Sequence, residues 1–353
     1  MNDDQFAFFQ KLVQTTGPSG YEQEPQAVWR ERVADVAAVE TDPLGNATAT
    51  LNASGSPRVM LEAHIDEIGF QIRAIDDQGF LHFQTIGGFD GSTLAGNRVR
   101  ILGPNGPVLG VIGRTPTHLL SEEDRSKVPK PKDMWIDIAA RDRQHAEQLV
   151  RVGDAGGRCH GVERMQGDWV TGNSFDDRMG AYVIAEVTRA LAAEELQSAL
   201  IAASCVQEEI GSRGATPAAF NIDAPLGIAV DVTYTTDHPR ASKTEHGDIR
   251  CGAGPVLTRG ANTNPRVFER LVEAAESAGV GYQLDADPRG TGTDQNAMYV
   301  VRGGMATGLV SVPTRYLHTS SEILSLDDVD AIVALLTRFI LDLKPDIDLT
   351  PWL

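Results

Sequence analysis

Carboxylate and imidazole side chains follow several short segments of this sequence at the points where those segments end. The apolar run 200–206 leads into Glu208 and Glu209, and a Gly-Ser-Arg-Gly turn follows. Short apolar runs that stop at turn residues are typical of buried strands. Other strand or loop ends carry His64 with Asp66, Asp176 with Asp177, Asp231, and His318. Because the carboxyl ends of strands in an open α/β sheet surround one crevice, we expect these side chains to meet.

The residue types in this set are metal ligands and proton acceptors. Two imidazoles with several carboxylates suit zinc, cobalt or manganese. One ion rarely needs so many acids, whereas two ions that share a bridging carboxylate do. Side chains alternate along an extended chain, so Glu208 and Glu209 point in different directions, and one can ligate a metal while the other acts as a base. The sequence therefore predicts a two-metal site with an adjacent base.

Each of these residues also has an ordinary structural explanation. Glu208 and Glu209 alone would be a solvated acidic turn, because buried acids are rare. The pair 176–177, followed by Arg178, would cap a helix and form a surface ion pair. His64 or His318 alone would be a hydrogen-bonded structural histidine. All of these explanations would have to hold independently, so we favour the metal site.

Composition excludes several other classes of function. With 353 residues the chain is long enough for about two domains. Its net charge of −18 argues against a nucleic-acid partner. No apolar stretch approaches the roughly 20 residues that span a bilayer, so no membrane partner is expected. The three cysteines are too few for a disulfide framework or a thiolate zinc site, and a reducing cytoplasm is the predicted location.

The elements that position these residues alternate between strands and helices. Residues 1–69 and 170–353 are predicted to form an α/β catalytic domain, with a mainly parallel sheet flanked by helices. Residues 70–169 contain short alternating segments and tight turns, and we interpret them as an inserted, β-rich domain. Its residues 121–132 are predicted to be a charged loop. The expected helices are 6–15, 23–36, 141–150, 179–191, 264–278 and a last one opened by a capping box of Ser325 and Asp328; the expected strands include 47–51, 59–63, 226–230 and 308–312.

Taken together, these motifs resemble the M42 family of metallo-aminopeptidases, which includes glutamyl and deblocking enzymes and relatives once labelled endoglucanases. The matching segments occur in the family's order and span nearly the whole chain. They are Ala63-His64-Ile65-Asp66-Glu67-Ile68-Gly69, Ser174-Phe175-Asp176-Asp177-Arg178-Met179-Gly180, Val206-Gln207-Glu208-Glu209-Ile210-Gly211, Val230-Asp231-Val232-Thr233, Gly292-Thr293-Asp294 and Arg315-Tyr316-Leu317-His318.

The resemblance implies a role for each of these residues. Asp176 would bridge two divalent ions, zinc or cobalt, and a cis peptide would follow it. The remaining ligands would be His64 and Asp231 for one ion and Glu209 and His318 for the other. Glu208 would be the general base that activates a shared water, and Asp66 would accept a hydrogen bond from the ring of His64.

The resemblance also implies an activity and an assembly. The enzyme would be a hydrolase that removes N-terminal residues from peptides with a free N-terminus. Residues 70–169 would be the dimerisation domain, and dimers would join into a homododecamer with active sites facing an inner chamber. The charged segment 121–132 could alter those assembly contacts.

Some alternatives remain open at this stage. A deacylase or carboxypeptidase would use the same two-metal core with a cationic pocket, for which Arg213 or Arg315 would serve. A glycosidase also needs two carboxylates but has no use for the histidines and Asp231. A non-catalytic protein would not require Glu208. Asp294 either supports the site or belongs to a turn, and His238 and His246 are predicted to lie on the surface.

Overall fold

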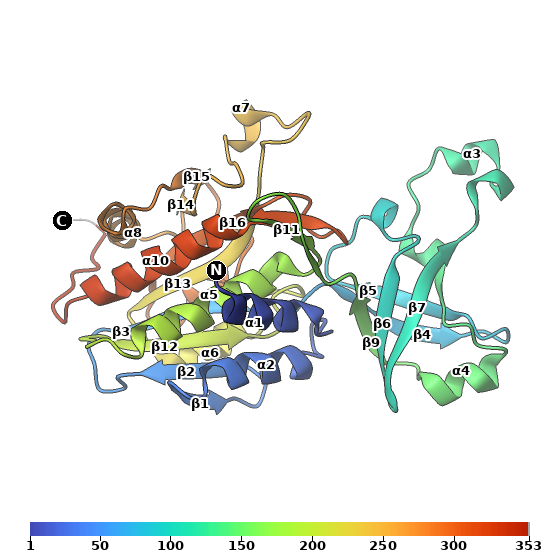
Figure 1. Ribbon diagram of the computed structural model, residues 1–353, viewed down its shortest axis with the longest axis horizontal. Helices are drawn as coiled ribbons and strands as arrows, with labels where there is room; N and C mark the ends of the chain where they lie inside the picture. The colour runs from blue at the N-terminus through green and yellow to red at the C-terminus, as the bar shows by residue number, and fades with distance from the viewer. Residues whose placement is uncertain (352–353) are drawn as a thin grey trace.

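The fold is organised around one large mixed β-sheet. The computed structural model describes residues 1–351, and Figure 1 shows the sheet flanked by helices with a smaller barrel at its side. The order of the eight strands is β1 (Ala38–Thr41), β2 (Ala47–Leu51), β12 (Ala199–Cys205), β3 (Arg58–His64), β13 (Leu226–Tyr234), β16 (Ala306–Thr314), β14 (Val256–Gly260) and β15 (Gln283–Asp287). The central strands β12, β3, β13 and β16 run parallel to one another.

Helices cover the two faces of this sheet unequally. The residues of β3 alternate between the faces, so that Val59, Leu61 and Ala63 join the larger core while Met60 joins the smaller one. The larger core is built with α1 (Asp3–Gln14), α2 (Gln23–Val33), α5 (Phe175–Leu191), α8 (Pro265–Ala278) and α10 (Leu326–Asp342). The smaller core is built with α6 (Ala215–Ile222) and α9 (Gln295–Met298). By the same alternation Glu62 and His64 face the smaller core.

A closed barrel with its own apolar core lies beside the sheet (Figure 1). Its strands follow the order β4 (Gly69–Ile75), β5 (Leu81–Ile86), β8 (Met134–Asp137), β7 (Gly106–Arg114), β6 (Arg98–Gly103) and β9 (Ala155–Arg158). A separate three-stranded sheet consists of β10 (Val162–Arg164), β11 (Trp169–Gly172) and β17 (Glu322–Ser325). The barrel strands therefore all come from residues 69–158, and β17 joins the third sheet from near the other end of the chain.

Several predicted elements differ from the observed ones. Strand β13 does not stop at Asp231 but continues to Tyr234, because it pairs with β16 along its whole length. The segment 121–132 is exposed as expected but contains a short helix, α3 (Glu122–Arg125). The predicted capping box of α10 is wrong: Ser325 forms no side-chain cap, and the Asp328 carboxylate instead accepts hydrogen bonds from the backbone N–H groups of Gly252 and Gly254.

Other expectations are met closely. Helix α8 begins at Pro265 after the Asn264 cap and ends at Ala278. Helix α4 (Arg143–Leu149) is the predicted helix of the barrel region, whereas the short surface helix α7 (Lys243–His246) was not predicted. All three cysteines are free thiols. Within residues 1–351 no helix combines the length and apolar character needed to cross a bilayer.

Candidate metal centre

The predicted site residues come together at the carboxyl edge of the central strands. His64 ends β3, Glu208 and Glu209 follow β12, and Asp231 lies within β13. Asp176 lies at the start of α5 and His318 in the loop after β16. These residues line a single cavity of about 300 Å³. The fold thus gathers into one cavity side chains that are as much as 254 positions apart in the sequence, from His64 to His318.

Asp176 lies between the two histidines. Its Oδ1 is 3.1 Å from Nε2 of His64, and its Oδ2 is 3.0 Å from Nε2 of His318. A cis peptide bond joins it to Asp177, as the resemblance implied. A carboxylate that directs its two oxygens at two different imidazoles has the geometry of a bridge between two ions.

Two sets of donor atoms share this aspartate. Atoms of His64, Asp176 and Asp231 lie within 4.8 Å of one another, and so do atoms of Asp176, Glu209 and His318. Oε1 of Glu209 is buried without a hydrogen-bond partner in the described chain, 3.5 Å from Nε2 of His318. Each set offers imidazole and carboxylate donors, which is the ligand preference of zinc and cobalt. The residues therefore fit two divalent ions.

The electrostatics of the cavity also call for positive charge. Burial raises the pKa of Glu208 to about 9, and it raises the pKa values of Glu209 and Asp231 as well. The neighbouring carboxylates of Asp176 and then Glu209 raise the pKa of His318 to about 11. Burial acts to raise the pKa of Asp176, but its hydrogen bonds with His318 and His64 outweigh burial and lower it. So many carboxyl groups are stable together only with protons or metal ions among them.

Asp66 connects His64 to both glutamates. Nδ1 of His64 lies 3.2 Å from the main-chain oxygen of Asp66 and 3.4 Å from its Oδ1. The buried carboxylate also accepts hydrogen bonds from the backbone N–H of Glu208 at 2.9 Å and of Glu209 at 3.2 Å, and from Ser19 Oγ at 2.6 Å. Asp66 thus holds the backbone of Glu208, the predicted base, and of Glu209, a residue of one donor set. The resemblance implied only its contact with His64.

Comparison with known proteins identifies the family of this chain. The sequence model of the M42 glutamyl aminopeptidases matches residues 45–335. The chain belongs to this family. It is 35% identical to the lysyl aminopeptidase of Pyrococcus furiosus over 350 residues, which cover 97% of this chain and 98% of the relative.

Solved structures agree with this assignment. A TET aminopeptidase from a marine-sediment thaumarchaeon superposes with a TM-score of 0.92 at 31% identity, covering 97% of both chains. The TET1 peptidase of Pyrococcus horikoshii, which can assemble into a tetrahedron or a large octahedral shell, superposes with a TM-score of 0.86 at 30% identity, covering 96% of this chain and all of that one. This M42 chain is a peptide hydrolase of the aminopeptidase type, and neither the glycosidase nor the deacylase alternative is supported.

The cavity of this M42 peptidase also lacks the cation that a carboxypeptidase would need. No lysine or arginine is among its lining residues within the described chain. Arg213 is exposed. Arg315 forms two hydrogen bonds to Asp237, at 2.5 and 2.9 Å, and covers the ring of Trp169. His238 and His246 belong to neither donor set, so they remain outside the candidate site as predicted.

Sequence reasoning missed two residues that hold the His318 loop. Glu322, at the start of β17, accepts hydrogen bonds from the backbone N–H of His318 at 3.0 Å and of Phe175 at 2.7 Å. Arg158, from the barrel strand β9, donates a hydrogen bond of 2.7 Å to the carbonyl of His318. His318 has a φ of 60°, an unfavourable conformation that surrounding contacts must maintain. A glutamate four positions after a histidine matches no sequence motif, so only the structure shows that Glu322 holds the His318 loop.

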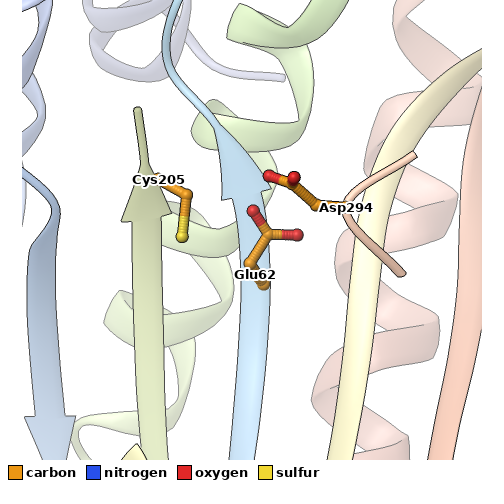
Figure 2. Close-up of side chains that lie close together, drawn as sticks. All are labelled: Glu62, Cys205 and Asp294. Carbon is orange, nitrogen blue, oxygen red and sulfur yellow. The ribbon is translucent and has the colours of Figure 1, made fainter. Parts of the chain in front are cut away.

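Asp294 lies in the turn before α9 and is buried. It is 2% exposed, and Figure 2 shows its carboxyl group facing that of Glu62, with Cys205 on the neighbouring strand. These three side chains form a second buried group of donors within 4.8 Å of one another, on the face of the sheet that His64 also occupies. Burial, and then the nearby Asp294, raise the pKa of Glu62. Asp294 therefore packs against the strand that carries His64.

Proposed function

We propose that this peptidase removes N-terminal residues from peptides with two divalent metal ions, zinc or cobalt. His64, Asp176 and Asp231 would hold one ion, and Asp176, Glu209 and His318 the other. The observation that carries the proposal is the placement of Asp176, whose two oxygens lie 3.1 and 3.0 Å from the two imidazoles. No other side chain among residues 1–351 belongs to both donor sets.

Glu208 is the proposed general base. Its Oε2 is 3.9 Å from Nε2 of His64, and it belongs to neither donor set, so its carboxylate remains available for proton transfer. When bound, the ions supply Lewis-acid activation of a water molecule and of the scissile carbonyl. Glu208 would accept the proton of that water and deliver it to the leaving amine.

The proposal extends to the domains and their assembly. Residues 1–69 and 170–353 would be the catalytic domain, and residues 70–169 the dimerisation domain. Six large apolar side chains of the latter region are exposed, namely Leu109, Val111, Leu119, Val128, Val152 and Met165. Exposed apolar side chains that lie next to one another mark contact surfaces between proteins. We infer that they join dimers and that dimers form a homododecamer, while a cytoplasmic location stays a prediction that rests on the free thiols.

The test is hydrolysis of aminoacyl-p-nitroanilides by EDTA-treated protein before and after Zn²⁺ or Co²⁺ is restored. We expect cleavage of unblocked substrates only after a metal is restored, and no cleavage of the matching N-acetylated substrates. If blocked and unblocked substrates were cleaved equally, a free N-terminus would not be required and the aminopeptidase mechanism would be wrong. Cleavage that persists after complete metal removal would exclude the two-metal site.

A further inference from the structure

The catalytic cavity extends beyond the metal centre toward the edge of the sheet. Besides the donor residues, its wall includes Thr258 of β14, Asp285 and Asp287 of β15, and the loop 291–293. The two aspartates therefore share one cavity with the groups that would act on the substrate. A substrate whose first peptide bond lies at the metal centre has its N-terminal side chain within this cavity.

The charge of the cavity depends on these two aspartates. The other lining carboxylates are those of Asp176, Glu208, Glu209 and Asp231, and two divalent ions would balance their four negative charges. Asp285 and Asp287 then remain as uncompensated charges, because no lysine or arginine is among the lining residues of the described chain. Once the metals are bound, the wall opposite them is acidic.

The geometry of β15 leaves both carboxylates free for a ligand. Side chains alternate along the strand, so Asp285 and Asp287 share one side, half-buried, while Leu284 is 59% exposed on the other. Asp285 Oδ1 accepts a hydrogen bond from the N–H of Ala286, and Asp287 Oδ1 accepts from those of Arg289 and Gly290. Neither carboxylate forms a hydrogen bond or ion pair with a cationic side chain among residues 1–351.

Two cations on the segment beside β15 are already paired with another carboxylate. Lys243 and Arg250, on the loop beside β15, each lie 2.7 Å from the carboxylate of Asp248. The positive charges of Lys243 and Arg250 are thus paired with Asp248 and do not neutralise Asp285 and Asp287. A cation that enters the cavity from solvent meets two aspartates that form no ion pair within residues 1–351.

We propose that Asp285 and Asp287 select substrates with a cationic N-terminal side chain, lysine or arginine. The ammonium or guanidinium group would lie against these carboxylates while the first peptide bond lies at the metal centre. This inference rests on the proposed function, since it assumes metal-loaded protein and an N-terminal substrate. It adds a preference for a positively charged N-terminal side chain. Such a preference sets the ratio of kcat/KM between charged and uncharged substrates.

The experiment compares p-nitroanilides of lysine, arginine, norleucine and glutamate with metal-loaded protein. Norleucine matches the aliphatic part of lysine without its charge. We expect the wild-type kcat/KM to be at least about tenfold higher for lysine than for norleucine and lowest for glutamate. In Asp285→Asn and Asp287→Asn the lysine-to-norleucine ratio should fall about tenfold, while kcat/KM for norleucine changes less than about twofold.

Glu195→Gln is the matched control. Glu195 is exposed beyond the C-terminal end of α5, whose N-terminal end carries Asp176, and a 17-residue helix is about 25 Å long. This variant loses the same unit of charge far from the cavity and should keep the wild-type ratio.

In Asp287→Asn the side-chain oxygen that accepts from Arg289 and Gly290 is retained, which preserves the turn.

A wild-type ratio near or below one would overturn the inference without any variant, and so would a ratio unchanged in both aspartate variants. In either case continued cleavage of norleucine p-nitroanilide would leave the proposed function intact. If no unblocked substrate were cleaved after metal loading, the proposed function itself would fail and this inference with it. Increasing salt should lower the lysine preference but not norleucine cleavage, because screening acts on the charge alone.

Discussion

The metal centre depends on single residues that touch more than one functional group. Asp66 is the clearest case, since one buried carboxylate contacts His64 and receives the backbone N–H groups of Glu208 and Glu209. Partners of this kind fix the orientation of a ligating ring. Here the same group also fixes the backbone of the proposed base, so that the proposed ligand and the proposed base are positioned together.

Replacing Asp66 with asparagine tests this double role. An amide lacks the negative charge and replaces one of the two acceptor oxygens with an N–H₂ group, so the His64 ring and the 208–209 backbone should be held less firmly. We expect metal affinity to fall about 10- to 100-fold, measured by competition with a chelator. Ser19→Ala removes only one hydrogen bond to Asp66 and should cause a much smaller loss. Wild-type metal affinity in Asp66→Asn would rule out this role.

Glu322 gives a prediction for the pH dependence of stability in metal-free protein. Burial raises its pKa from an ordinary 4.5 to about 8. The folded state therefore holds a proton on Glu322 that the unfolded state releases above about pH 4.5, and stability falls as pH rises from about 5 to 8. Glu322→Gln cannot titrate, so the fall should be shallower. Urea unfolding at several pH values measures this, and parallel curves for the two proteins would contradict it.

Individual elements differ in how well the sequence predicts them. Helix α8 was predicted correctly because its signals are local: Asn264 accepts from the N–H groups of Arg266 and Val267, Pro265 opens the helix, and Gly279 ends it with a φ of 69°. The capping box of α10 failed because tertiary contacts decide it. Gly252 and Gly254 lie far from Asp328 in the sequence. Their N–H groups donate to the Asp328 carboxylate, which the capping box would have paired with the N–H of Ser325.

The α8 cap can be measured directly. Asn264→Ala leaves the N–H groups of Arg266 and Val267 without their acceptor and should lower the free energy of unfolding by about 1 kcal/mol. Asn264→Asp keeps an acceptor oxygen and should lose less. Chemical denaturation of the metal-loaded proteins gives both values. Equal stability of Asn264→Ala and wild type would show that the cap contributes nothing.

At the scale of the whole molecule, the barrel and the sheet both contribute residues to the candidate site. Arg158 reaches from β9 of the barrel to the carbonyl of His318, so the inserted region helps to hold a proposed metal ligand. The sequence predicted the α/β architecture, the β-rich insertion and the residues that converge, since hydrophobic patterns and strand-end residues are local. It could not predict Arg158, Glu322 or the pairing of β13 past Asp231, because these depend on contacts between distant segments.

The proposed assembly is tested on the exposed apolar surface of the barrel region. Leu119 and Val128 are 69% and 68% exposed, and aspartate at both positions would place charge in an apolar contact. We expect Leu119→Asp/Val128→Asp to form smaller particles than wild type in light scattering after size-exclusion chromatography. Leu44→Asp, at an exposed apolar position between β1 and β2, should keep the wild-type mass. An unchanged mass in the double variant would show that Leu119 and Val128 do not form the assembly contact.

The most direct test of the central claim combines metal content and turnover in Glu208→Gln. Glu208 is proposed as a base and not as a ligand, so the variant should bind two ions per subunit, as wild type does, by elemental analysis. Its kcat for an unblocked substrate should fall about 10²- to 10⁴-fold, the range that general-base catalysis contributes. Two bound ions with wild-type turnover, or loss of an ion together with activity, would contradict the assignment of base and ligands.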